Sequence, residues 1–151
     1  MFKAFAFLSK KDGLGMQEFI DYYEGKHIPL ILSLAPAPLI YKRRYIVRDQ
    51  ELTKSGNLVD YDVMTELGFA DQEEFASWMG KLSAPGIAEQ VAEDEGRFLD
   101  RSRIKVYVVQ EHETPVSEER ALVPRVGLGG TTENPPRGAV SLDSHQPRFQ
   151  A

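Results

Sequence analysis

The sequence predicts an α+β fold whose elements follow the order β-α-β-β-α-β. Two observations indicate this order: period-two alternation of apolar residues predicts four strands, and apolar residues at helical spacing separate the first strand from the second and the third from the fourth. The predicted strands span residues 2–9, 39–48, 61–69 and 104–110. This order is that of the split βαβ, ferredoxin-like arrangement, an antiparallel four-stranded sheet with its helices on one face.

The first predicted helix begins after Gly15, a tolerable N-cap, with Glu18 three residues later. Pro29 lacks a backbone donor and crowds the carbonyl of Gly25, so we expect a kink or a restart around residues 26–29. The apolar stripe that predicts this helix comprises Met16, Phe19, Ile20, Tyr23, His27, Leu30, Ile31 and Leu34.

After the first helix, the sequence predicts two further strands, a helix interrupted by a proline, and a last strand. Asp71 is a good N-cap with Glu74 three residues later, and Pro85 interrupts the helix that follows. A second helical piece runs through residues 87–99. The two middle strands place Leu39, Tyr41, Arg43, Tyr45 and Val47 on one face of the first, and Tyr61, Val63, Thr65, Leu67 and Phe69 on one face of the second.

The composition is that of one globular domain, with 151 residues of which 42% are hydrophobic. A net charge of −5 argues against nucleic acid or an anionic membrane as the main partner. No apolar run approaches the ~18 residues of a membrane span. The N-terminal stretch lacks a secretory h-region, which favours a cytoplasmic protein. Cysteine is absent, which excludes thiolate catalysis, disulfides and cysteine-ligated metals.

A change of composition near residue 115 predicts a domain over residues 1–114 and a tail over residues 115–151. Five of the nine prolines lie in the tail, which shows no period of 2 or 3.6 residues. Alone, this tail cannot bury enough apolar surface to offset its ordering entropy. It is either mobile or an arm packed on the domain or on a partner subunit.

The first and last strands carry apolar side chains on both faces. Phe5 and Phe7 share one face of the first strand, whereas Ala6 and Leu8 share the other. The last strand, residues 104–110, has the same pattern. Because the helices cover only one face of the sheet, the other needs a partner. The simplest partner is a second copy of the chain, so we predict a homodimer.

Several separated motifs resemble those of the EthD-like proteins, in the right order from about Phe2 to Thr114. MQEFIDYYEGKHIPLI resembles the family's first helix, and YKRRYI and YDVMTELGFAD resemble its second and third strands. APGIAEQVAEDEGRFLD resembles its acidic segment, with Ala84 in place of the usual serine. The tail lies outside the resemblance.

The resemblance implies a dimeric α+β barrel with a pocket between helices and sheet in each protomer. It also implies acid–base chemistry without an organic cofactor. Proteins of this superfamily include lactone isomerases, polyketide cyclases, dehydratases, a plant hydroxynitrile lyase, cofactor-free monooxygenases and haem-binding enzymes. The fold alone does not choose among these activities, and haem binding through His27 stays open as a minor alternative.

His27 is the leading candidate for a catalytic residue, with Tyr23 beside it. His27 lies on the apolar stripe one turn after Tyr23 and two residues before Pro29. Its imidazole can change protonation near neutral pH, as acid–base catalysis requires. The alternative is a structural histidine bonded to a backbone carbonyl that Pro29 leaves free. The resemblance favours the catalytic role, because the matching histidine of related proteins lines the pocket.

Five further side chains are predicted to bind the substrate. Phenols can donate to a carbonyl or enolate oxygen, a guanidinium can hold a carboxylate, and an indole can wall a pocket. The alternatives are amphipathic core tyrosines, an ion pair between the arginine and the acidic helix near Glu95, and an ordinary core tryptophan. The five are Tyr22, Tyr41, Arg43, Tyr61 and Trp78.

We expect neither a metal nor a cofactor. The three histidines, His27, His112 and His145, have no metal-ligand spacing, and the glycines of residues 127–130 lack the dinucleotide fingerprint. Asp94, Glu95 and Asp100 are expected to cap or salt-bridge the chain into the last strand. The alternative is a catalytic use, because paired carboxylates can share protons.

The sequence therefore predicts a cofactor-independent lyase or isomerase, of dehydratase or cyclase type. Its substrate would be an apolar, oxygenated small molecule, aromatic or polyketide-like. His27 would transfer a proton beside a carbonyl, and Tyr23 with other pocket donors would stabilise the oxyanion. Two alternatives stay open: a cofactor-free monooxygenase, and a non-catalytic metabolite-binding accessory protein.

Overall fold

The computed structural model describes residues 1–52, 56 and 59–115, and the unit described below is Met1–His112. Its four strands form one antiparallel sheet in the order β2-β3-β1-β4. The predicted ferredoxin-like fold is confirmed. Apart from Pro115, the predicted tail lies outside the described residues. The strands are β1 (Phe2–Leu8), β2 (Ile40–Tyr45), β3 (Val63–Phe69) and β4 (Lys105–Val109).

The register places one row of side chains from all four strands on the same face of the sheet. Ala6 is opposite Thr65 on one side and Val106 on the other, and Thr65 is opposite Arg43. This face carries the helices. The next row lies on the opposite face, here called the outer face, and consists of Tyr107, Phe5, Glu66 and Lys42.

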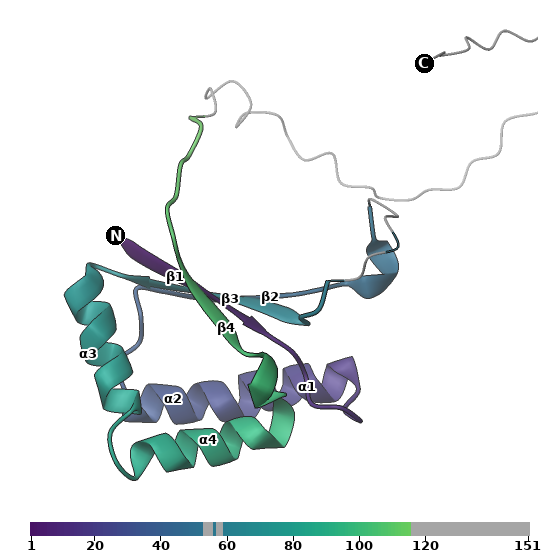
Figure 1. Ribbon diagram of the computed structural model, residues 1–151, viewed down its shortest axis with the longest axis horizontal. Coiled ribbons are helices and arrows are strands. Elements are labelled where there is room, and N and C mark those ends of the chain that lie inside the picture. The colour runs from purple at the N-terminus through teal and green to yellow at the C-terminus, as the bar shows by residue number, and fades with distance from the viewer. Residues whose placement is uncertain (53–55, 57–58, 116–151) are drawn as a thin grey trace, which may run out of the picture. The chain divides into compact units, whose positions relative to one another are not determined.

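All helices of the described residues that Figure 1 labels lie on one side of the sheet. α2 and α4 run side by side, and α3 stands across their ends (Figure 1). The predicted cap of α3 is present, because the Asp71 carboxylate accepts from the backbone N–H of Glu74 at 2.9 Å. The helices are α1 (Met16–Tyr22), α2 (Ile28–Leu34), α3 (Gln72–Leu82) and α4 (Ile87–Phe98).

A π-helical turn, Tyr23–His27, joins α1 to α2, and α2 begins at Ile28, within the range 26–29 where a kink or a restart is expected. The backbone N–H of Ile28 bonds back to the carbonyl of Tyr23, five residues earlier. The extra residue in this turn takes up the disturbance before Pro29, so the helix continues without a break. As a result, Tyr23 and His27 are both buried on the sheet side, at 2% and 6% exposure.

The core between sheet and helices consists of two groups of side chains. One is built on Phe19, Tyr23 and Phe98, and the other on Ile31, Phe69 and Trp78. Members of both groups line the cavity described below, so the packing that stabilises the fold also positions the site.

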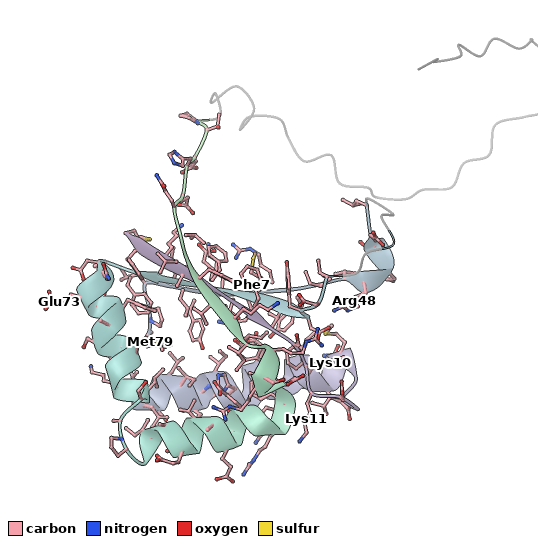
Figure 2. The ribbon with its side chains drawn as sticks, viewed as in Figure 1. Phe7, Lys10, Lys11, Arg48, Glu73 and Met79 are labelled. Atoms are coloured by element: carbon pink, nitrogen blue, oxygen red, sulfur yellow. The ribbon has the colours of Figure 1, made fainter. Side chains whose placement is uncertain are left out.

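The outer face is not covered within the described unit. Phe7 lies on the side away from the helices (Figure 2) and contacts the rings of Tyr61 and Tyr107 at 4.9 and 6.1 Å. Tyr107 itself is 57% exposed. Glu66, buried at 4%, is held on this face by ion pairs with Lys3 and Arg44. Among the described residues, no helix is both long and apolar enough to span a membrane.

Candidate functional site

A cavity of about 560 Å³ lies between the helix face of the sheet and the helices. This volume is within the range of small-molecule sites. Figure 2 shows Met79 on the inner side of α3 and Glu73 on its outer side, and Met79 is one of the lining residues. Most of the lining is apolar, and its polar members include Tyr23, His27, Tyr41, Thr65, Glu95 and Arg101.

His27 meets an acidic partner that holds its ring. Nδ1 of His27 lies 2.6 Å from Oδ2 of Asp94 on α4. The ring centroid is 5.3 Å from that of Tyr23 and 5.0 Å from that of Phe98, so the imidazole is packed as well as bonded. With Nδ1–H donated to the carboxylate, the neutral ring carries its free acceptor on Nε2. His27 lines the cavity, so it is placed to accept a proton from a bound molecule.

Tyr22 supports this pair from outside the cavity. Its hydroxyl donates to the other oxygen of Asp94, Oδ1, at 2.7 Å, and its ring stacks on Phe98. Burial raises the pKa of Tyr22, with the neighbouring carboxylate adding to the effect. Tyr22 was predicted as a substrate ligand, but it is not among the residues that line the cavity. It is a positioning residue for Asp94.

Tyr23 lies deep in the cavity wall. Its hydroxyl shares a 2.9 Å hydrogen bond with the hydroxyl of Thr65 on β3. Burial raises the pKa of Tyr23 to about 12. The phenol therefore stays protonated across the physiological range, with its hydrogen-bonding capacity partly taken by Thr65.

Tyr41 is the lining phenol whose hydroxyl has no partner among the described residues. Its hydroxyl makes no hydrogen bond with any described residue, whereas the hydroxyls of Tyr23 and Tyr45 are both bonded. Arg43 lies over the Tyr41 ring at 4.9 Å. Burial is the main cause of the raised pKa of Tyr41. Tyr41 is thus a neutral donor available to a bound oxygen atom.

Arg43 is not brought to the cavity. Its guanidinium binds Glu24 of the π turn with two hydrogen bonds, of 3.0 and 2.7 Å. Glu24 also accepts from the Tyr45 hydroxyl at 2.7 Å. The Arg43 hydrogen bonds hold the pKa of the Glu24 carboxyl below its ordinary value. The expected ion pair of Arg43 exists, but with Glu24 rather than with the acidic helix near Glu95.

Of the two remaining residues predicted to bind the substrate, Trp78 lines the cavity and Tyr61 does not. β3 begins only at Val63, so the alternation expected from residue 61 does not hold, and Tyr61 packs against Phe7 of the outer face. Tyr61 does not line the cavity. Trp78 does line it, and its indole N–H donates to the carbonyl of Pro36 at 3.0 Å, which fixes the ring as a wall.

Sequence reasoning did not place Asp94 beside His27, nor Thr65 and Arg101 in the lining of the cavity. Capping or salt-bridging was the favoured expectation for Asp94 over a catalytic use, since nothing in the sequence indicates that α4 lies beside the π turn. The signal was the run of three acidic residues at 93–95 within an otherwise amphipathic helix. Glu95 does form the expected kind of salt bridge, with Arg101 at 2.9 Å. In the described part of the chain, no group of three or more His, Asp or Glu side chains is placed to hold a metal ion.

Solved structures share this fold at low sequence identity. An Arabidopsis thaliana protein is 16% identical, with a TM-score of 0.51 over 77% of this chain and 100% of that chain. An EthD family protein of Bacillus halodurans is 17% identical, with a TM-score of 0.51 over 74% and 100%. A hydroxynitrile lyase of Passiflora edulis, at 15% identity over 75% and 96% with a TM-score of 0.49, is too distant to argue from.

No curated protein sequence matches this chain. The family model described as "EthD domain" matches residues 11–102. The matched segment runs from the loop before α1 to the turn before β4, and so includes His27, Asp94 and most of the cavity lining. This chain belongs to the EthD domain family.

Proposed function

We propose that the protein is a cofactor-independent lyase or isomerase, of dehydratase or cyclase type, in which His27 transfers a proton within the cavity. The observation that carries the proposal is the 2.6 Å contact between His27 Nδ1 and Asp94 in the wall of a largely apolar cavity. A buried histidine that is held by a carboxylate and lines a ligand-sized cavity is an arrangement suited to general acid–base catalysis.

The polar groups of the cavity support chemistry beside a carbonyl. For dehydration of a β-hydroxy carbonyl compound, Nε2 of His27 removes the α-proton and an enolate forms. The Tyr41 hydroxyl donates to the enolate oxygen. The enolate then collapses, the bond to the β-oxygen breaks, and the His27 imidazolium returns the proton to the leaving hydroxide. The products are the α,β-unsaturated carbonyl compound and one water molecule.

The remaining lining residues select the substrate. Trp78, Phe75 and Met79 give the cavity apolar and aromatic walls, which favour an aromatic or polyketide-like molecule and exclude water from the reacting carbon. The Tyr23–Thr65 pair adds hydroxyl groups beside His27. Tyr22 acts indirectly, by fixing Asp94.

The test is proton transfer to and from a panel of β-hydroxy ketones, lactones and cyclisable polyketide analogues. Proton NMR in deuterated water follows loss of the α-proton signal, and the same spectra report water elimination. We expect activity in the wild type and loss of at least 10²-fold in His27→Gln. Tyr45→Phe is a matched control, since this tyrosine binds Glu24 and does not line the cavity.

The same assay distinguishes the alternatives. Activity that disappears when oxygen is removed would overturn the lyase proposal in favour of a cofactor-free monooxygenase. Binding of panel compounds that is unaffected by His27→Gln, with no exchange in the wild type, would overturn it in favour of a metabolite-binding accessory protein.

We also propose that the outer face packs against a second copy of the chain. The aromatic group of Phe7, Tyr61 and Tyr107 is uncovered within the described unit, and exposed apolar groups of this kind favour association. Sheet-to-sheet pairing about a two-fold axis would cover this aromatic group in both protomers.

A further inference from the structure

We propose that Arg101 and Glu95 form an anion subsite at the rim of the cavity, and that the substrate carries a carboxylate on an aromatic or conjugated body. The proposal rests on the proposed function in one respect only, that the cavity is the substrate site. It adds the chemical class of the substrate and a second group that binds it, which takes no part in the proton transfer at His27.

The charges of the cavity are confined to this rim pair. Among the described residues that line the cavity, Arg101 is the only arginine or lysine and Glu95 the only carboxylate. The Arg101 side chain is 51% exposed and that of Glu95 is 21% exposed, whereas His27 and Tyr23 are buried. The pair therefore lies where the apolar cavity meets solvent, and an amphiphilic ligand would keep its charged end there.

The guanidinium keeps a free face for a ligand. Nε of Arg101 donates to Oε2 of Glu95 at 2.9 Å. Within the described part of the chain, the two terminal nitrogens of Arg101 make no hydrogen bond. A carboxylate can take two parallel N–H groups from an arginine, in a geometry that an ammonium or a neutral donor does not reproduce.

The backbone at Arg101 is held in place. Arg101 begins a short 3₁₀ turn, Arg101–Arg103, in which the Asp100 carboxylate accepts from the N–H of Ser102 at 3.1 Å. The N–H of Asp100 donates to the carbonyl of Ser9 at 3.0 Å. The flanking side chains, Leu99 and Ile104, also line the cavity. This fixed turn sets the direction from which the guanidinium approaches the rim, which reduces the entropy lost on binding.

Glu95 orients the guanidinium of Arg101 and limits its affinity for an anion. Its hydrogen bond orients the guanidinium, while its negative charge weakens anion binding by repulsion. Glu95→Gln keeps an oxygen acceptor for Nε and removes the repulsion, so this variant should bind an anion more tightly. A merely structural salt bridge would not give this gain.

The test compares two probes of the same shape, 2-naphthoate and 2-naphthamide, by isothermal titration calorimetry on the full chain. We expect the wild type to bind the anion about tenfold more tightly than the amide, since charge-assisted bidentate bonds exceed neutral ones. Arg101→Gln should bring the ratio of dissociation constants close to one. Arg101→Lys should keep part of the preference, and Glu95→Gln should increase it severalfold.

Arg103→Gln is the matched control. Arg103 lies on the same turn, donates to the carbonyl of Asp60 and does not line the cavity. The substitution Arg103→Gln therefore removes the same charge from the same turn without changing the cavity. Its probe ratio should equal that of the wild type. Circular dichroism and thermal melting of each variant verify folding, and Arg101→Lys keeps the test valid if Arg101→Gln is unstable.

Three results would overturn the subsite: equal affinity of the wild type for the two probes, binding of neither, or a ratio unchanged in both Arg101→Gln and Arg101→Lys. Its failure is separable from that of the proposed function, because the subsite is read from binding alone. The anion preference should persist in His27→Gln, whereas α-proton exchange should not. Conversely, exchange that depends on His27 would stand even if the probe ratio does not depend on Arg101.

Discussion

Asp94 is the residue on which the behaviour of His27 depends. It accepts from the Tyr22 hydroxyl with one oxygen and contacts His27 Nδ1 with the other. This arrangement selects the tautomer that leaves Nε2 free, and it would stabilise the imidazolium formed when a proton is taken up. The catalytic power proposed for His27 is therefore shared with a residue 67 positions away in the chain.

We predict that Asp94→Asn lowers kcat by about 10²–10⁴-fold, because the amide no longer selects the reactive tautomer or stabilises the imidazolium. Tyr22→Phe should lower kcat by less than tenfold, since Asp94 keeps its contact with His27. The rates of α-proton exchange of the two variants check this order. Equal effects of the two changes would contradict it.

Tyr23 gives a pH-dependent contribution to stability. Burial raises its pKa in the folded state to about 12, from an ordinary value of 10.0. A raised pKa favours the protonated folded state, so the contribution is fully present below pH 10 and is lost as pH rises through 12. A shift of this size corresponds to about 3 kcal/mol.

We predict that Tyr23→Phe flattens the fall in unfolding free energy between pH 10 and 12, because phenylalanine cannot ionise. Urea unfolding at a series of pH values measures the slope. Identical slopes in the wild type and Tyr23→Phe would contradict the prediction.

At the scale of single elements, the strands and helices could be predicted from the sequence because each has its own period. The π turn could not, because Pro29 indicates a disturbance without saying how the preceding residues absorb it. The partners of Arg43 and Tyr61 could not be predicted from the sequence either. Strand alternation predicts the face of a side chain, but the π turn brings Glu24 to Arg43, and the late start of β3 leaves Tyr61 on the outer face.

The pairing of β2 with β3 depends on close approach at Gly68. A Cβ added at Gly68 would lie 2.8 Å from the Cβ of Ile40, the residue opposite it in the register. We predict that Gly68→Ala destabilises the fold by about 1–3 kcal/mol, because β2 must move or Ile40 must adopt a strained conformation.

Gly25→Ala is the matched control within the π turn, where an added Cβ meets nothing within 4 Å. It should be neutral or stabilise by up to about 1 kcal/mol, because alanine restricts the unfolded chain. Chemical denaturation of both variants measures the difference. A Gly68→Ala protein as stable as Gly25→Ala would contradict the packing described for these strands.

At the scale of the whole molecule, apolar side chains on both faces of β1 and β4 predict more covering surface than one chain supplies. Within the described unit the helices leave the outer face uncovered, where Tyr107 of β4 is 57% exposed. On the helix face, Val106 and Val108 of the edge strand β4 are also more than half exposed. The family and the fold were within reach of the sequence, because several motifs occur in the right order. The site could be predicted only in part, since its hydrogen-bonded pairs, His27–Asp94 and Tyr23–Thr65, join residues from distant elements.

We predict a dimer in sedimentation equilibrium that Tyr107→Asp, on the outer face, converts to a monomer. Val108→Asp is the control, because the register places Val108 beside Ala4 on the helix face, with a similar exposure of 62%. Placing a charge in a buried apolar interface is costly, whereas at an open position it is not. A monomeric wild type, or dissociation only in Val108→Asp, would contradict the proposed interface.

The central claim, that Asp94 holds His27 with Nε2 free for a ligand, is tested most directly by nitrogen-15 NMR of the imidazole rings, with His27→Gln for assignment. In the neutral ring we predict protonated Nδ1 and unprotonated Nε2, and a change in the Nε2 shift on adding hydroxyaromatic ketones or lactones. The Asp94→Asn variant should lose the tautomer preference. A neutral His27 protonated on Nε2, with a signal that no compound changes, would contradict the account and leave His27 a structural residue.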